Sequence, residues 1–156
     1  MSDLQTLLIW RNHPDIRRFM FNQHEIKFEE HQAWFQRVSN DKTRCILIVE
    51  ENRQPIGFVQ FSQVSIGGVA NWGFYSSPYS PKGTGRKLGV TALNHAFGFL
   101  GLRKVCGQAI ETNIASIAFH QSLGFKKEGV IRQQQTGGSN CNNIYCFGLV
   151  SDEWNI

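Results

Sequence analysis

The sequence has few of the features that mark membrane proteins and metal-binding proteins. Its unbroken apolar segments, such as Cys45 to Val49, are only as long as a strand. A helix that crosses a bilayer needs about 20 apolar residues, so we expect no membrane span. The 4 cysteines and 5 histidines form neither a CxxC nor an HxxxH pair, which are common metal-ligand spacings. We therefore expect no metal site and, with no apolar signal segment, a cytoplasmic protein with reduced thiols.

The sequence also lacks a large excess of positive or negative charge. The formal net charge is +4, from 16 Lys+Arg against 12 Asp+Glu, and adjacent basic residues come only in pairs such as Arg17-Arg18. Proteins that bind nucleic acid usually carry a dense basic stripe, often with aromatic residues between the charges. We expect no nucleic-acid partner, whereas a mild positive excess suits a ligand that bears phosphate.

Proline is rare, at 4 residues, but glycine and aromatic side chains are plentiful. The 156 residues include 15 Gly, 12 Phe and 4 Trp, and 41% of the chain is hydrophobic. This composition excludes a disordered tail, and the length fits one hydrophobic core. We predict a single domain over residues 1–156, in which the glycines serve local purposes.

The spacing of apolar residues predicts alternating helices and strands. Apolar residues recur at helical spacing over 3–21, with a break at the turn 12–15, and again over 28–38 and 113–123. A long helix is also predicted between Gly85 and Leu100. Strands are predicted at 44–50, 56–64, 69–75, 104–111, 125–135 and 143–150. This order predicts an α/β fold with a mixed, mostly antiparallel sheet, one central parallel crossover and flanking helices.

A glycine-containing loop, Lys82 to Lys87, comes just before the long predicted helix. Because Gly83 and Gly85 have no side chains, backbone N–H groups there can face an anion, and the helix dipole adds positive potential. The loop lacks the GxxxxGK[ST] pattern of a Walker A loop, and Gly89 comes one residue too late for a GxGxxG dinucleotide loop. A phosphate-binding loop and an ordinary turn from strand to helix both stay open.

The order of these elements resembles the GCN5-related N-acetyltransferases (GNATs). After the loop, the long helix and a strand come Asn113-Ile114-Ala115-Ser116 and then Ser122-Leu123-Gly124-Phe125. In that family the loop amides bind the pyrophosphate of acetyl-coenzyme A (acetyl-CoA). Carried onto this sequence, the resemblance implies a cofactor-binding loop made of Lys82, Gly83, Thr84, Gly85, Arg86 and Lys87. Ser80 and Lys87 depart from the family pattern, but binding by backbone amides should survive both changes.

The resemblance also implies how acetyl-CoA lies in its site. Two strands splay apart and hold the pantetheine arm between them, with backbone groups near Phe74 and Tyr75 beside it. Asn113 either contacts the cofactor or serves only as the N-cap of its helix. Holding both substrates in one cleft supplies much of the rate, so no covalent enzyme intermediate is needed.

His120 and Glu111 are the predicted catalytic residues. His120 occupies the place where many GNATs carry a tyrosine that protonates the coenzyme A thiolate, and an imidazole can do this near neutral pH. In the alternative interpretation, His120 has no catalytic role and packs on its helix near Ile117. Glu111, at a strand end, is the candidate to accept the amine proton, and its alternative is a solvated carboxylate.

The N-terminal half narrows the resemblance to the acetyltransferases of pseudaminic acid biosynthesis. The similar segments are Trp10 to Met20, Phe28 to Phe35, Trp72 to Tyr75, Glu128-Gly129 and Glu153-Trp154. Those enzymes acetylate the 4-amino group of a UDP-linked 4-amino-4,6-dideoxy sugar. Acetyltransferases of ribosomal proteins and antibiotics lie in the wider neighbourhood.

Four residues of the N-terminal half are candidates for binding that substrate. The Arg11 guanidinium matches a diphosphate, or ties the first helix to a nearby carboxylate. Met20 and Phe21 flank the uracil and sugar, or pack in the core. His31 contacts the substrate, or is a histidine at the edge of the core.

We therefore predict an acetyl-CoA-dependent N-acetyltransferase whose acceptor is the amino group of a nucleotide-linked amino sugar. The alternatives are an acetyltransferase for ribosomal-protein N-termini or small amines, and a non-catalytic regulatory module that binds coenzyme A. GNATs usually open with a strand, whereas helical spacing here begins at Leu4. With that strand missing or displaced, the sheet edge is either exposed or covered by a second chain, as in a homodimer.

Overall fold

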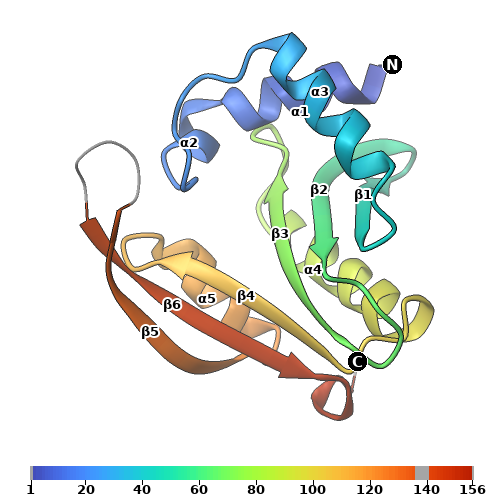
Figure 1. Cartoon of the computed structure of the whole chain (residues 1–156), viewed down its shortest axis with the longest axis vertical. Coiled ribbons are helices and arrows are strands. Elements are labelled where there is room, and N and C mark those ends of the chain that lie inside the picture. The colour runs from blue at the N-terminus through green and yellow to red at the C-terminus, as the bar shows by residue number, and fades with distance from the viewer. Residues whose placement is uncertain (1, 136–140, 156) are drawn as a thin grey trace.

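A computed structural model describes residues 2–135 and 141–155, and its elements follow the predicted order (Figure 1). The helices are α1 (Ser2–Asn12), α2 (Pro14–Arg17), α3 (Phe28–Ser39), α4 (Thr84–Asn94) and α5 (Ile114–Ser122), with a π-helical turn η1 (His95–Phe99) and a 3₁₀ turn η2 (Ser151–Glu153). The strands are β1 (Arg44–Glu51), β2 (Gln54–Ser62), β3 (Val69–Ser76), β4 (Lys104–Ile110), β5 (Lys126–Gln135) and β6 (Cys141–Val150). The predicted α/β class is confirmed.

The six described strands form one mixed sheet in the order β1-β2-β3-β4-β6-β5. Strands β3 and β4 are parallel, and the other described neighbours are antiparallel, as predicted. Parallel pairing covers only Val69–Asn71 and Lys104–Cys106, although both strands continue beyond it. The two strands then diverge, and Figure 1 shows the resulting V, with α1, α2 and α3 over one arm and α5 beside the other.

Two hydrophobic clusters hold the helices to the sheet. The larger one packs α4 and α5 against one face, and its fully buried members include Leu88, Leu93 and Val105. A Cβ on Gly57 would lie 1.9 Å from the Leu88 Cδ1 atom, so the bare Gly57 backbone allows α4 to approach β2. The smaller cluster joins α1 and α3 to the other face of the sheet through Leu7, Trp10, Phe58 and Trp34.

The N-terminal helices form the predicted helix, corner and second short helix. Pro14 occupies the first position of α2, where a missing N–H costs nothing. The His13 ring accepts a hydrogen bond from the Asp15 backbone N–H at 3.3 Å and so caps α2. Glu29 and Glu30 lie in the first turn of α3, as the helix dipole favours.

Element ends differ from the prediction by a few residues. The hairpin turn between β1 and β2 needs only Asn52 and Arg53, both with positive φ (52° and 63°), because such turns match the right-handed twist of paired strands. The long helix ends in a π-helical turn, where the Leu100 N–H donates to the His95 carbonyl at 2.9 Å.

In the described chain, α1 precedes every strand, and β1 and β5 lie at the two edges of the sheet. The homodimer suggested by the first edge stays a prediction. Within residues 2–135 and 141–155, no helix has the length and hydrophobicity needed to cross a membrane.

Candidate active site

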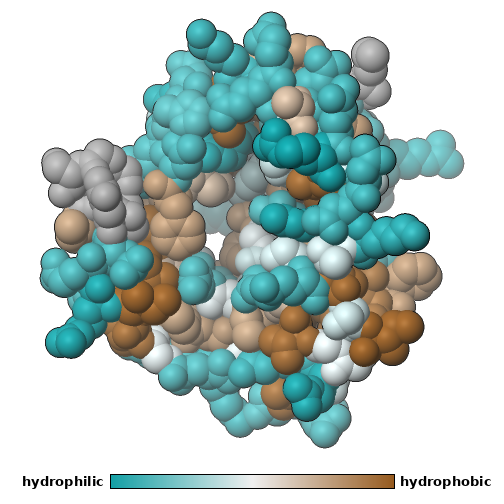
Figure 2. Space-filling model, viewed as in Figure 1, coloured by the Kyte–Doolittle hydropathy of each residue, from teal (hydrophilic) through white to brown (hydrophobic). Residues whose placement is uncertain are grey.

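A cleft of about 1060 Å³ lies where β3 and β4 diverge. We call its two sides the helical half and the loop half. The helical half is lined by residues of α1, α3 and the segment between α2 and α3, including Arg11, Met20, Phe21, His31 and Trp34. The loop half includes Gly85, Asn113, Ser116 and Phe119. Figure 2 shows mostly hydrophilic atoms over the helical cap and hydrophobic atoms on both arms below it.

The glycine loop supplies a helix N-terminus to the loop half. Gly83 is the N-cap of α4 and has φ 92°, a left-handed conformation that favours glycine. Gly85 lines the cleft, and a Cβ there would lie 3.7 Å from the Phe119 ring. Backbone N–H groups at the start of α4 therefore have no side chain between them and the cleft at Gly85.

Two basic side chains of the loop, those of Arg86 and Lys87, bond to groups outside the cleft lining. The Arg86 guanidinium donates to the Ser122 carbonyl at 3.1 Å, and the Lys87 ammonium pairs with the Glu51 carboxylate. Neither these two residues nor Lys82, Gly83 and Thr84 line the cleft. Binding of a pyrophosphate by the amides of this loop stays a prediction, to which the backbone and the dipole of α4 would supply positive potential.

Asn113 caps the N-terminus of α5 and also lines the cleft. Its side-chain oxygen accepts a hydrogen bond from the Ser116 N–H at 3.1 Å, which confirms the N-cap of α5. Phe74 and Tyr75 line the cleft from β3. The Phe74 ring packs on Phe119 with ring centroids 4.7 Å apart, and the half-buried Tyr75 packs against the smaller hydrophobic cluster.

His120 is buried behind the cleft wall and is only 1% exposed. Its Nδ1 lies 2.7 Å from the Ser116 carbonyl, and its Nε2 accepts a hydrogen bond from the Trp72 indole N–H at 3.1 Å. Burial lowers the pKa of His120. Because both ring nitrogens are occupied, the geometry favours the packing alternative over proton donation. The Trp72 bond joins β3 to α5 beside the point where the strands part.

Glu111, like His120, does not line the cleft. Its Oε1 accepts a hydrogen bond from the Asn143 N–H at 2.8 Å, and its Oε2 accepts one from the Asn143 amide at 3.0 Å. These bonds tie the end of β4 to β6. The geometry therefore favours a structural role for this carboxylate.

The helical half contains all four predicted substrate residues, Arg11, Met20, Phe21 and His31. Phe21 is 52% exposed, so the alternative that it packs in the core is wrong. His31 is 4% exposed and stacks on Trp34 with ring centroids 5.0 Å apart. Burial lowers the pKa of His31, and a hydrogen bond with the Leu4 backbone opposes that shift.

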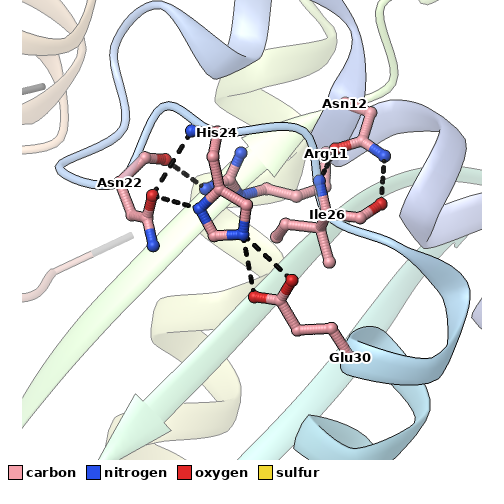
Figure 3. Close-up of polar contacts among 6 residues, drawn as sticks. All are labelled: Arg11, Asn12, Asn22, His24, Ile26 and Glu30. Carbon is pink, nitrogen blue, oxygen red and sulfur yellow. Dashed lines mark hydrogen bonds and ion pairs between the residues drawn. The ribbon is translucent and has the colours of Figure 1, made fainter. Parts of the chain in front are cut away.

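Side chains from α1 and α3 hold the segment between α2 and α3 in place (Figure 3). Arg11 donates through Nη2 to the Asn22 carbonyl at 2.7 Å. The Asn12 amide pairs with both backbone groups of Ile26, at 2.8 and 2.9 Å. His24 contacts the Glu30 carboxylate at 2.9 Å, and this bond lowers the pKa of Glu30.

Three buried polar atoms of the described chain have no hydrogen-bond partner, and all three belong to residues that line this cleft. They are Arg11 Nη1, His31 Nε2 and Gln60 Oε1. An unpaired buried polar atom costs about 1–3 kcal/mol. Their presence in the lining of one cleft marks it as a binding site for a polar ligand.

The charges of the helical half are mainly positive. Three arginines line the cleft there, Arg11, Arg18 and Arg37, against Asp15 and Glu30. Both carboxylates have partners, since Asp15 pairs with Arg18 at 3.3 Å and Glu30 with His24. Over residues 2–135 and 141–155 we find no cluster of three or more His, Cys, Asp or Glu side chains that could hold a metal ion.

The sequence alone did not single out Gln60 or Arg37 as cleft residues. Gln60 could have been found from the period of two in β2, which places it on the same face as Phe58. Arg37 is in the last turn of a helix, where a basic residue also serves the helix dipole. Its position therefore gave no distinct signal.

Comparisons with known proteins point to one family. The acetyltransferase (GNAT) domain matches residues 1–126. Acetyltransferase PseH of Campylobacter jejuni is 27% identical over 124 residues, which cover 80% of this chain and 77% of PseH. An uncharacterized protein of Methanocaldococcus jannaschii is 31% identical over 137 residues, but these cover 81% of this chain and only 26% of that protein.

Solved structures show the same fold. The spermidine N-acetyltransferase of Vibrio cholerae, in complex with CoA and spermine, matches with a TM-score of 0.89 at 20% identity, covering 98% of this chain and 92% of that one. C. jejuni PseH in complex with acetyl coenzyme A matches with a TM-score of 0.73 at 19% identity, covering 96% and 91%. At such low identity, these two likenesses concern the fold alone.

Proposed function

The chain belongs to the acetyltransferase (GNAT) family, and from that premise we propose that it acetylates the amino group of a nucleotide-linked amino sugar, of the UDP-4-amino-4,6-dideoxy type. Acetyl-CoA is the acetyl donor, as in the GNAT structures that contain CoA or acetyl-CoA. The acceptor class is the part that needs argument. The observation that carries it is the unpaired, buried Nη1 atom of Arg11 in a cleft half where both carboxylates have partners.

The residues of the loop half fit acetyl-CoA. The cleft is open between β3 and β4, Gly85 leaves space beside Phe119, and the left-handed Gly83 starts α4. In this proposal the backbone of Lys82, Gly83, Thr84, Gly85, Arg86 and Lys87 holds the pyrophosphate. The backbone near Phe74 and Tyr75 and the Asn113 side chain hold the pantetheine arm. When bound, acetyl-CoA supplies the activated acyl carbon.

The helical half fits an acceptor that is both anionic and aromatic. A guanidinium donates two parallel hydrogen bonds to phosphate oxygens, and Arg11 has one nitrogen atom that is buried and unpaired. The half-exposed Phe21 and the neighbouring Met20 offer apolar surface for a base or a sugar. His31 Nε2 is free to bond a hydroxyl or a phosphate.

A polyamine is the second candidate, because the V. cholerae spermidine N-acetyltransferase matches with the high TM-score given above. A polycation needs carboxylates that are free to pair with it. In the helical half, however, Asp15 is paired with Arg18 and Glu30 is bonded to His24, and the remaining arginines, Arg11 and Arg37, repel an ammonium group. The charge pattern therefore favours the nucleotide-linked acceptor.

The four cysteines, which all lie in the described chain, are free thiols. Free thiols fit a reducing compartment, and a cytoplasmic location is part of this proposal. Small-molecule acceptors are the partners it names.

The proposal is tested by release of free coenzyme A thiol. Purified protein is mixed with acetyl-CoA and, separately, with a UDP-4-amino sugar, with spermidine and with a peptide that has a free N-terminus. We expect release and an acetylated product by mass spectrometry only with the nucleotide-linked amine. Release with spermidine but not with the sugar would refute the acceptor class. Binding of coenzyme A without turnover of any amine would support the non-catalytic module.

A further inference from the structure

The place where β3 and β4 part is where the acceptor amine must meet the acetyl group, and one side chain beside that place has no assigned role. Gln60 of β2 pairs in register with Gly73 of β3. The parallel pairing of β3 with β4 ends two residues earlier, at Asn71 and Cys106. Gln60 is therefore on the strand next to the start of the opening, and it lines the cleft.

The absence of a side chain at Gly73 lets the Gln60 amide lie across β3. A Cβ on Gly73 would be 3.3 Å from the Gln60 Nε2 atom and 3.6 Å from its Cγ atom. Gln60 also shares a face with Phe58, which packs under Trp34 and Tyr75 in the helical half. These contacts direct the Gln60 side chain to the face that receives the acceptor.

The Gln60 Oε1 atom is buried and has no hydrogen-bond partner. A carbonyl oxygen can only accept a hydrogen bond, so the missing partner must be a donor. The acceptor amine is such a donor, and it keeps its lone pair free while one of its N–H groups bonds the amide. We propose that Gln60 holds the attacking amine, with Oε1 accepting a hydrogen bond from the amine N–H.

This contact strengthens as the reaction proceeds. The amine lone pair forms the N–C bond to the acyl carbon, the C–S bond breaks, and the sulfur leaves with the bonding electrons. The nitrogen becomes positively charged on attack and then loses a proton, and the thiolate gains one, so the products are an amide and a free thiol. A hydrogen bond to an ionised donor is stronger than a neutral one, so Gln60 favours the transition state over the bound substrate.

The inference rests on the proposed function, because it requires the acceptor to lie in the helical half. It adds a residue that contacts the nucleophile itself, whereas Arg11 recognises a remote part of the acceptor. It holds for any amine that the cleft accepts.

The test compares Gln60→Leu and Gln60→Glu with the control Gln54→Leu, an exposed glutamine at the start of the same strand that does not line the cleft. We expect Gln60→Leu to lower kcat for acetyl transfer about tenfold or more. The control should change it less than about twofold, which is the range expected for a surface substitution. Acetyl-CoA affinity should stay within about twofold in all variants, since Gln60 and Gln54 both lie on β2, outside the loop half.

The pH profile separates a contact with the amine from a structural role. A carboxylate in Gln60→Glu also accepts the amine N–H, but it stabilises the ammonium form, so kcat should recover at high pH and its rising limb should shift to higher pH. Equal kcat in Gln60→Leu and Gln54→Leu, or an unshifted limb in Gln60→Glu, would overturn the inference.

Each assay is run with the nucleotide-linked amine and with a small free amine such as hydroxylamine. If the wild type turns over only the small amine, the proposed acceptor class fails, and the Gln60 comparison still decides the present inference. If it turns over neither, both proposals fail.

Discussion

Replacement of Arg11 by methionine tests how the helical half recognises its acceptor. Arg11→Met keeps the length and apolar stem of the side chain but removes the guanidinium, whose Nη1 atom is buried and unpaired and whose Nη2 atom bonds the Asn22 carbonyl at 2.7 Å. Burial also lowers the pKa of Arg11.

The size of the effect follows from the bonds at stake. A hydrogen bond to a charged group contributes about 1.5–3 kcal/mol, which corresponds to about a 10- to 150-fold rise in KM for the nucleotide-linked amine. The unfolding free energy should change by less than about 1 kcal/mol, because the lost bond to Asn22 is offset by removal of a buried, unpaired donor. KM for acetyl-CoA should not change.

Steady-state thiol release with each substrate varied in turn measures both KM values, and urea unfolding measures stability. Arg17→Met is the matched control, since Arg17 lies in the neighbouring helix, pairs with Glu25 at 3.6 Å and does not line the cleft. Equal KM values for the acceptor in the Arg11 and Arg17 variants would refute the reasoning. So would a loss of acetyl-CoA affinity in Arg11→Met alone.

Three further predictions concern the loop, the packing of the helices and the buried histidines. Lys87→Met should leave acetyl-CoA affinity within about twofold, because the Lys87 ammonium is paired with Glu51. Gly83→Ala should weaken acetyl-CoA affinity, because the φ of 92° at this position costs a residue with a side chain about 1–2 kcal/mol. Calorimetry of acetyl-CoA binding distinguishes the two variants. Gly89→Ala should lower the unfolding free energy, measured in urea, by about 1–3 kcal/mol, because the new Cβ would lie 2.5 Å from Leu123 Cδ1. A rise in the unfolding free energy, as the higher helix propensity of alanine alone would give, would contradict this. Burial lowers the pKa of His31 and His120 from 6.5, so below that pH the unfolded chain binds protons that the folded chain does not. Stability should therefore fall from pH 7.5 to 5.5, and less so in His120→Asn; parallel pH profiles of the two proteins would contradict the assignment.

Local patterns in the sequence predicted most of the fold, because the apolar periods of helices and strands differ. The helix over 28–38, the strand over 44–50 and the corner at Asn12 to Asp15 are recovered within a residue or two. The strands predicted at 44–50 and 56–64 left too many residues between them, since the observed turn depends on two left-handed non-glycine residues, Asn52 and Arg53, that apolar periodicity does not reveal. The π-helical turn after Asn94 lies within the single long helix that was predicted to run to Leu100.

The cleft was harder to predict, because it depends on which partner each side chain finds. Arg11, Met20, Phe21 and His31 do meet in one half of it. His120 and Glu111 lie close in sequence to the cleft residue Asn113. Their polar atoms, however, are hydrogen-bonded to residues of other elements, His120 to Trp72 and Glu111 to Asn143. Such partners are fixed only when the sheet is assembled. The same assembly leaves the buried Gln60 Oε1 atom without a hydrogen-bond partner.

The most direct test of the acceptor assignment is the ratio of two specificity constants. kcat/KM is measured for a UDP-4-amino sugar and for spermidine, with the same enzyme, acetyl-CoA concentration and salt. One or two charge-assisted hydrogen bonds in a cleft half without free carboxylates predict that the nucleotide-linked amine is preferred by about 100-fold or more. A ratio near one, or a preference for spermidine, would contradict the account.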